Sequence, residues 1–168
     1  MISLKRIGSK DGLLFKAVRL RALQDAPGAF ASTYAKESLL TDAEWEERAL
    51  RWSSDRSVCC LAMDGEEVCG IAGSFLDEDD STRARLISMW TAPTHRRQGT
   101  GSLLVNEILA WAVGKRAHVL QLMVTSKNQT AILFYERLGF VMTRQTKPYP
   151  NDADEIEYEM VKPLPAEG

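Results

Sequence analysis

Three consecutive stretches with strand character, joined by short turns, place the strongest constraint on the fold of this chain. Residues 57–63, 68–76 and 83–91 are rich in apolar and β-branched residues. The connections 64–67 and 77–80 are short and contain Asp, Glu and Gly, which favour turns. Strands that follow one another so closely pair as neighbours, so an antiparallel meander of three strands is predicted.

Helices and further strands precede and follow this meander. Apolar periodicity predicts strands at 1–7, 119–124, 141–145 and 155–161, and helices at 13–23, 41–54, 101–115 and 128–138. The run 147–154 is rich in Pro, Asn and Asp and is interpreted as a loop. The predicted order is βααβββαβαββ, an α/β (α+β) fold around one sheet, in a single domain over residues 1–168.

Two local signals define helix ends. Thr41 and Glu44 form a capping-box pattern, which predicts the start of the second helix. Gly139 stands where a left-handed residue ends the last helix, and Phe140 is expected to pack back on Phe134.

Composition and charge exclude several classes of protein. The 168 residues have the size of one domain, and no apolar run approaches the roughly 20 residues that span a bilayer. The first seven residues alternate instead of forming a signal-peptide core, so a cytoplasmic location is expected. A net charge of −2 provides no general attraction for nucleic acid or a membrane surface. Cys59, Cys60 and Cys69 lack the spacing of a metal site and are expected to be buried thiols.

The segment 90–102 carries the clearest chemical signal. It joins a predicted strand to the long helix and contains Arg96, Arg97, Gly99 and Gly101. The glycines let the backbone approach a ligand, the helix N-terminus offers free N–H groups, and the arginines add positive charge. This combination predicts a site for a phosphate or pyrophosphate.

Two common phosphate-binding loops do not match this segment. A P-loop needs a lysine after the last glycine, where Ser102 stands, and the dinucleotide fingerprint needs a small residue where Leu104 stands. A basic helix cap without a ligand is the structural alternative.

A second group of residues shares one face of the predicted helix 128–138. Asn128, Ala131 and Tyr135 are separated by three and then four residues. They combine an amide, a small side chain and a phenol on that face. Alternatively, Asn128 caps the helix and Tyr135 belongs to the core.

With these two segments, the sequence resembles the GNAT superfamily of acyl-CoA-dependent N-acetyltransferases. The family signature, Arg/Gln-x-x-Gly-x-Gly/Ala, is matched by Arg96, Gly99 and Gly101. The segment 128–140 resembles the second family motif, a helix with an Asn, an aromatic pair and a terminal Gly-Phe. Further similarity lies at residues 20–23, 29–30 and 157–160.

The resemblance implies a mixed, mostly antiparallel sheet whose fourth and fifth strands splay apart to admit acetyl-CoA. The implied enzyme is an acyltransferase that moves an acetyl group directly to a primary amine of a small molecule or protein N-terminus, without a metal. The cofactor-binding residues it implies are Met89, Trp90, Thr91, Arg96, Arg97, Gln98, Gly99, Thr100, Gly101, Ser102, Asn128, Ala131 and Tyr135. A monomer and a homodimer both stay open.

The resemblance also implies roles for these residues. The backbone of 89–91 would bind pantetheine, the loop 97–102 would bind the pyrophosphate, and a bulge at Met89 or Trp90 would present an N–H to the thioester carbonyl. Tyr135 would be the catalytic acid that protonates the leaving thiolate.

The base and the acceptor pocket are less defined. The strand 83–91 has no carboxylate, so the base candidates are Glu37, Asp152, Asp154 and Glu155, or a chain of waters. Two histidines are not favoured, and several aromatic residues either line the acceptor pocket or form core. The histidines are His95 and His118, and the aromatic residues are Phe30, Tyr34, Trp45 and Trp52.

Two other functions stay open at this point. One is a non-catalytic module that binds or senses acyl-CoA, and the other is an interaction domain that keeps the fold but has lost the ligand. The intact Gly99 and Gly101 disfavour the second, and Tyr135 with Asn128 favours catalysis over sensing.

Overall fold

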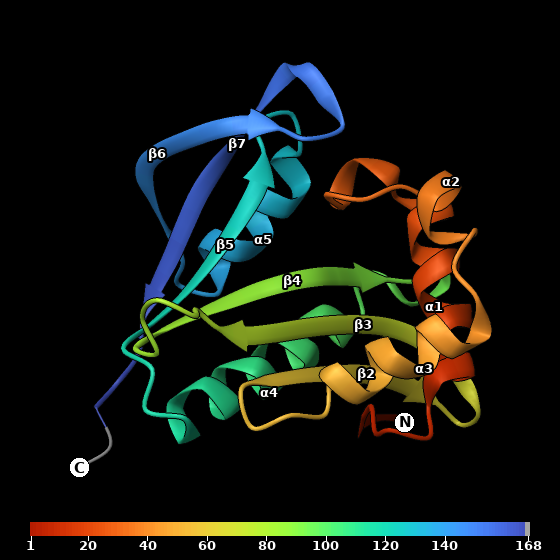
Figure 1. Ribbon diagram of the computed structural model, residues 1–168. Coiled ribbons are helices and arrows are strands. Elements are labelled where there is room, and N and C mark those ends of the chain that lie inside the picture. Colours follow the sequence, from red (N-terminus) through yellow and green to blue (C-terminus); the bar gives the residue numbers. More distant parts are fainter. Residues whose placement is uncertain (167–168) are drawn as a thin grey trace.

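The computed structural model describes residues 1–166, which form one seven-stranded sheet flanked by helices (Figure 1). The strands are β1 (Ile2–Arg6), β2 (Ser57–Asp64), β3 (Glu67–Leu76), β4 (Arg83–Thr91), β5 (Val119–Thr125), β6 (Val141–Tyr149) and β7 (Asp152–Pro163). The helices are α1 (Gly12–Asp25), α2 (Tyr34–Glu37), α3 (Asp42–Arg51), α4 (Thr100–Gly114) and α5 (Gln129–Arg137), with 3-10 turns η1 (Pro27–Ala29) and η2 (Pro93–His95). No helix in this described part is long and apolar enough to cross a membrane.

The sheet is mixed and mostly antiparallel, as predicted. Its strand order is β1-β2-β3-β4-β5-β7-β6, and only the β4–β5 pair is parallel. These two strands pair only where Arg83–Arg85 faces Val119–Gln121, and beyond that point they diverge into the V visible in Figure 1. The predicted splay of the fourth and fifth strands is therefore confirmed.

Helices cover both faces of the sheet around this V. Helix α4 lies behind β2, β3 and β4 and buries Leu104 and Ile108 completely against them. Helices α1 and α3 pack on each other at the opposite face, where the rings of Phe15 and Trp45 meet edge to face at 5.4 Å. Trp52 follows α3 and lies against β3. Its ring is so close to the strand that a Cβ at Gly73 would come within 3.1 Å of it.

A buried ion-pair network ties the three N-terminal helices to β4. Glu37 is 2% exposed and accepts from Arg19 and from Arg48, and Arg19 also donates to Ser88 Oγ at 2.8 Å. Burial alone would raise the pKa of the Glu37 carboxyl, but the hydrogen bonds and charges of the two arginines outweigh it, so that pKa lies below the ordinary glutamate value. Glu37 is thus an ionised structural group.

The predicted element order is correct apart from one addition and one wrong loop. The short helix α2 is not predicted between the first two helices, since four residues give no helical period. The run 147–154 is mostly strand, because β6 extends to Tyr149 and β7 begins at Asp152. Pro148 is tolerated within β6 because β6 is the edge strand and needs no partner for that nitrogen.

The local helix ends follow the sequence signals. Thr41 and Glu44 form the capping box of α3, and Gly139 has the left-handed φ of 94° after α5. The ring of Phe140 packs on Tyr135, at 5.6 Å between centroids, where packing on Phe134 was predicted. The chain turns sharply at Gly139 and brings Phe140 back over the last turn of α5, where Tyr135 lies one residue beyond Phe134.

The Glu37 network leads to a stability prediction. Replacing Glu37 with Gln leaves two arginine charges without their carboxylate and is expected to lower the unfolding free energy at neutral pH by about 3 kcal/mol. Because the folded-state pKa is lowered, the stabilisation is complete above the unfolded value of 4.5 and is lost as the pH falls below it. Urea unfolding across this pH range measures the difference, with the exposed Glu47→Gln as control; equal stability of the two variants would contradict the network's role.

Candidate functional site

A bulge in β4 faces the opening between β4 and β5. Ser88 and Met89 together stand opposite the single residue Ala72, and Ser88 has a positive φ of 59°. Beyond Arg85 the side of β4 toward β5 has no strand partner, so its backbone groups are left for another ligand. The bulge predicted at Met89 or Trp90 thus begins at Ser88 and includes Met89.

The N-terminus of α4 is not capped by any described side chain. Gly99 is its N-cap residue with a left-handed φ of 84°, and it has no side chain to accept from the first N–H groups. In contrast, Thr41 caps α3 and Asn128 caps α5 with side-chain oxygens. The first turn of α4 therefore keeps its backbone donors available to an anion.

Side chains around this turn hold the loop in place. Arg96 donates to Asp25 at the end of α1 and to the carbonyl of Thr91, at 3.0 Å for the latter. Gln98 donates to the carbonyl of Thr94 at 3.2 Å. Arg97 is exposed and forms no ion pair among the described residues. Of the two predicted cationic residues, Arg96 is already paired, whereas Arg97 lies open to a ligand.

Gly101 joins the two sequence motifs. A Cβ added at this position would lie 3.1 Å from Phe134 Cζ and 3.3 Å from Met89 Cε. The absence of a side chain therefore lets α4 approach both α5 and β4 closely. The predicted loop and the predicted helix therefore meet at this glycine, through Phe134.

Asn128 has a structural role that leaves part of its side chain available. Its Oδ1 accepts from the N–H of Ala131 at 3.1 Å, so the helix-cap alternative is confirmed. The residue also lines a pocket of about 360 Å³ together with Thr125 and Glu155 from the neighbouring strands and the segment 26–29. The pocket thus lies between the ends of β5 and β7 and the segment around η1.

Tyr135 is a core residue whose hydroxyl is unpaired. Its ring meets Phe134 and Phe140 edge to face at 5.2 and 5.6 Å. Burial raises the pKa of the phenol, so it stays protonated at neutral pH. The hydroxyl makes no hydrogen bond within residues 1–166, and it is not fully enclosed, unlike the indole nitrogen of Trp45. The core alternative therefore holds for the ring and leaves the hydroxyl free to donate.

The wide end of the V is bridged by hydrogen bonds, which we call the strap. Tyr149 Oη donates to the carbonyl of Phe30 at 2.6 Å, and Asn151 Nδ2 donates to the carbonyls of Phe30 and Ser32 at 2.9 and 3.1 Å. These contacts attach the β6–β7 hairpin to the segment after η1. The hairpin, β5, β4 and this segment together enclose what we call the central hollow.

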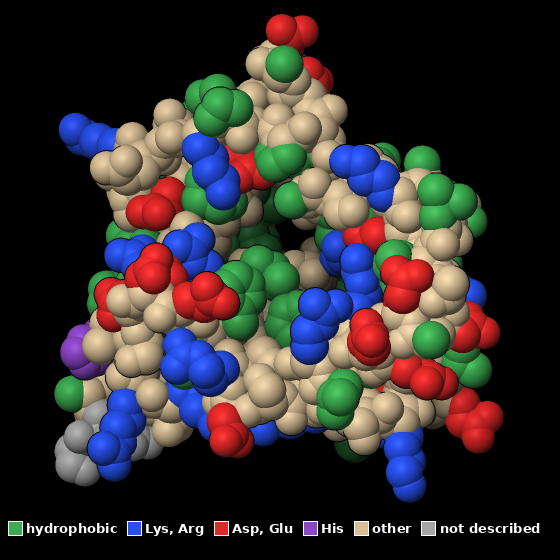
Figure 2. All heavy atoms as spheres, viewed as in Figure 1, with side chains coloured by type: hydrophobic (Ala, Val, Ile, Leu, Met, Phe, Trp, Pro, Cys, Tyr) green, Lys and Arg blue, Asp and Glu red, His purple; other side chains and the backbone are tan. Residues whose placement is uncertain are grey.

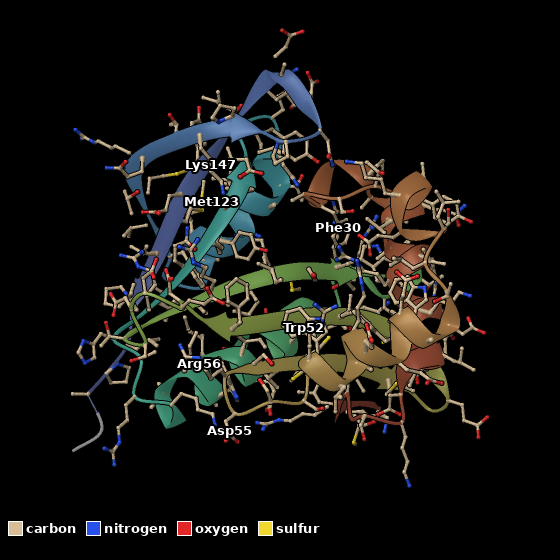
Figure 3. All side chains as sticks on the ribbon, in the orientation of Figure 1. Phe30, Trp52, Asp55, Arg56, Met123 and Lys147 are labelled. Atoms are coloured by element: carbon tan, nitrogen blue, oxygen red, sulfur yellow. The ribbon has the colours of Figure 1, made fainter. Side chains whose placement is uncertain are left out.

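The central hollow is visible on the molecular surface. Figure 2 shows a depression in the middle of this face with hydrophobic side chains along its walls. In Figure 3, Met123 and Lys147 border it from the β5–β7 side, and Phe30 lies on the opposite side. A second pocket of about 380 Å³ lies beside α3 and is lined by Arg48, Arg51, Trp52, Ser57 and Phe75.

The aromatic residues predicted near the acceptor divide into two groups. Trp45 and Phe30 are buried, and Trp45 belongs to the core alone. Trp52 lines the pocket beside α3, and Tyr34 is exposed on α2. Of these four residues, Phe30 thus lies beside the central hollow and Trp52 lines the pocket beside α3.

The carboxylates predicted as bases are not favoured by their surroundings. Both oxygens of Glu37 accept from arginines, and Asp152 and Asp154 are exposed at the hairpin tip. Glu155 lies 3.9 Å from Lys127 Nζ. No cluster of three or more His, Cys, Asp or Glu side chains suited to a metal occurs among the described residues.

Glu157 was not predicted and occupies a more distinctive place. It is 7% exposed on β7 and pairs across the sheet with Thr125 and Lys147. Burial raises the pKa of its carboxyl, and the charge of Lys147, 3.9 Å away, lowers it by less. The alternation along the last strand could have shown that Glu157 and Glu159 share a face, but only the register of three strands shows that this face borders the hollow.

The chain matches the model of the acetyltransferase (GNAT) family over residues 21–140. This range contains the β4 bulge, the loop before α4 and the whole of α5. It is also the range in which the two sequence motifs meet.

Solved structures share the whole fold at low sequence identity. An acetyltransferase of the GNAT family from Streptococcus pneumoniae is 24% identical, with a TM-score of 0.79 and coverage of 98% of this chain and 100% of that one. An acetyltransferase from Salmonella typhimurium, solved with acetyl-CoA, is 14% identical, with a TM-score of 0.80 and coverage of 100% and 96%. The ribosomal-protein-S18-alanine N-acetyltransferase of Escherichia coli is 19% identical, with a TM-score of 0.71 and coverage of 100% and 97%.

Proposed function

The chain belongs to the GNAT family of acetyltransferases, which transfer an acetyl group from acetyl-CoA, and we propose that its acceptor is a primary amine carried by a small molecule or a protein N-terminus. The observation that carries this proposal is the unpaired β4 edge beside the uncapped N-terminus of α4, which Gly101 brings close to Met89 of β4 and Phe134 of α5. We also propose that residues 1–168 form one domain.

The residues present suit acetyl-CoA. When bound, acetyl-CoA supplies the thioester whose acetyl group is transferred. The unpaired backbone of Met89, Trp90 and Thr91 would hold the pantetheine as an added strand. The N–H groups from Arg97 to Ser102 would hold the pyrophosphate at the start of α4.

Other residues would orient acetyl-CoA without forming an ion pair with it. Asn128 caps α5 with its oxygen and keeps its amide N–H groups for the pantetheine arm, and Ala131 leaves room beside it. Arg96 would act through Asp25 and Thr91 by fixing the loop. An N–H at the Ser88–Met89 bulge would stabilise negative charge on the thioester oxygen.

Tyr135 would give a proton to the departing sulfur. Its raised pKa keeps the phenol protonated, and its hydroxyl has no competing partner in the described part of the chain. A free phenol already has a pKa about 1.5 units above that of a thiol, and burial makes Tyr135 a weaker acid still, so the proton moves only as full negative charge develops on the sulfur.

The strap limits the shape of the acceptor. It closes the wide end of the V, so an amine must reach the β4 bulge through the central hollow. An amine at the end of a slender group fits this path better than one on a flat protein surface. The similarity to an enzyme that acts on an alanine of ribosomal protein S18 supports including protein N-termini.

A non-catalytic module that senses acyl-CoA is the alternative. It would need the same backbone edge and loop but not the free hydroxyl of Tyr135. Acceptor-dependent release of free thiol from acetyl-CoA, measured over a panel of amines, tests catalysis against sensing.

For the location of the protein, we propose the cytoplasm. Cys59, Cys60 and Cys69 are buried free thiols, and a reducing compartment keeps thiols unpaired.

The first functional prediction concerns the loop. Gly101→Val would push α4 away from Phe134 and Met89 and displace the N–H groups, so acetyl-CoA affinity should fall at least about tenfold, or 1.4 kcal/mol. Calorimetry measures this, with Gly114→Val at the open end of the same helix as control. Unchanged affinity in a folded Gly101→Val protein would remove the loop from the cofactor site.

The second prediction concerns the acid. Tyr135→Phe removes only the hydroxyl and should lower kcat about 10²-fold while acetyl-CoA affinity stays nearly constant. Tyr158→Phe on β7 is the matched control and should leave kcat unchanged. If Tyr135→Phe retains the parent kcat where the chemical step limits the rate, Tyr135 serves packing alone.

The third prediction concerns the strap. Replacing Tyr149 with Phe and Asn151 with Ala removes the hydrogen bonds to Phe30 and Ser32, each worth about 1 kcal/mol. The ratio of kcat/KM for a branched amine to that for a slender amine should rise about fivefold. Tyr34→Phe serves as the control, and an unchanged ratio in the double variant would mean that the strap does not restrict the acceptor.

A further inference from the structure

Only two carboxylates in the described chain are buried, and they differ in the hydrogen bonds that they accept. Glu37 accepts three hydrogen bonds from arginines. Glu157 accepts no hydrogen bond from residues 1–166, and its nearest cation is Lys147 Nζ at 3.9 Å. A buried carboxylate with open lone pairs is costly unless a donor reaches it.

Sheet register places Glu157 at the central hollow. Thr125 on β5 and Lys147 on β6 stand directly opposite it, so the three side chains share one face. Tyr149, which forms the strap, follows Lys147 by two residues and lies on the same face of β6. In Figure 3, Lys147 and Met123 mark this face beside the hollow.

The side chains around Glu157 come from three strands. On β6 they are Lys147 and the phenol of Tyr149; on β7, Glu155 and Glu159 share the same face. Glu155 lies near Lys127, and Glu159 accepts from Gln121 Nε2 at 3.2 Å. The facing residues of β5, Met123 and Thr125, are neutral. Glu155 and Glu157 each have one cation at 3.9 Å and accept no hydrogen bond from residues 1–166, and Glu157 is the more buried of the two, with 9% of its side chain exposed against 16%.

We propose that Glu157 is the proton acceptor for the substrate ammonium, directly or through one water, and that Lys147 is a positioning residue that holds its carboxylate toward the hollow. The inference rests on the proposed function. A charged amine offers the N–H donors that Glu157 lacks, and it arrives through the hollow that this face borders. The raised pKa, which comes from burial, makes the carboxylate a stronger base than an exposed glutamate.

The protons balance in this scheme. Glu157 takes one proton from the ammonium, which leaves a neutral amine with a free lone pair, and later releases that proton to solvent. As the C–N bond forms and the C–S bond breaks, the nitrogen loses a second proton. That proton passes to water, and the Tyr135 phenolate, which has given its own proton to the sulfur, takes one back from water.

The pH profile of kcat/KM tests the proposal. In the parent protein, activity should fall on the acid side as Glu157 becomes protonated. Glu157→Gln should lower kcat/KM about 10²-fold and remove this acid limb. Asp154→Asn, at the exposed hairpin tip of the same strand, should leave the rate and the limb unchanged.

Lys147→Met tests whether Lys147 acts on Glu157, because loss of a purely structural lysine would not shift the pH profile. Loss of the neighbouring positive charge should move the acid limb to higher pH, because the pKa of Glu157 rises further when its cation is removed. An acid limb that stays in place in Lys147→Met, or persists in Glu157→Gln, would overturn the proposal.

Carbon-13 NMR of the glutamate carboxyls in the protein without substrates provides a readout independent of turnover and of variant folding. The Glu157 resonance, assigned by its loss in Glu157→Gln or by backbone correlation in the parent, should titrate above the ordinary glutamate value. Titration at the ordinary value would overturn the proposal. Absence of thiol release by the parent protein with every amine would overturn the proposed function instead, whereas turnover with an unaltered Glu157→Gln profile would overturn this inference alone.

Discussion

The short parallel pairing of β4 with β5 is the constraint on which the rest of the structure depends. Only Arg83–Arg85 and Val119–Gln121 are joined, so most of both strands face one another without hydrogen bonds. Unpaired backbone is tolerated only where water or a ligand can satisfy it. The gap is therefore a built opening in an otherwise continuous sheet, and the surrounding elements are arranged to keep it open.

Two contacts far from the pairing hold the halves of the sheet at a fixed separation. On one side, α4 meets α5 at Gly101, where even a methyl group would crowd Phe134. On the other, the strap joins Tyr149 and Asn151 to Phe30, across about 120 residues of sequence. The first contact is apolar and close-packed, whereas the second consists of neutral hydrogen bonds of modest strength. The contact between α4 and α5 is thus harder to separate than the strap.

Much of this arrangement can be predicted from sequence because it is local. Alternation predicts the β2–β4 meander, the Thr41 capping box places α3, and the glycines at 99 and 101 mark the loop before α4. The motifs also indicate the splay through the resemblance. The features that sequence does not predict depend on contacts between distant segments. Glu37 is a candidate base until the fold brings Arg19 and Arg48 to it, and a loop is predicted for the hairpin because Pro148 is acceptable only on an edge strand.

Glu157 illustrates the same limit at the site itself. In sequence it is one of three alternating glutamates on a strand, a pattern typical of a solvated face. Its burial arises where β5 and β6 flank it, so it depends on the register of three strands and not on the local sequence pattern. The strap begins at Tyr149, two residues along β6 from Lys147, so the path that we propose for the amine and the face that carries the carboxylate depend on the same hairpin.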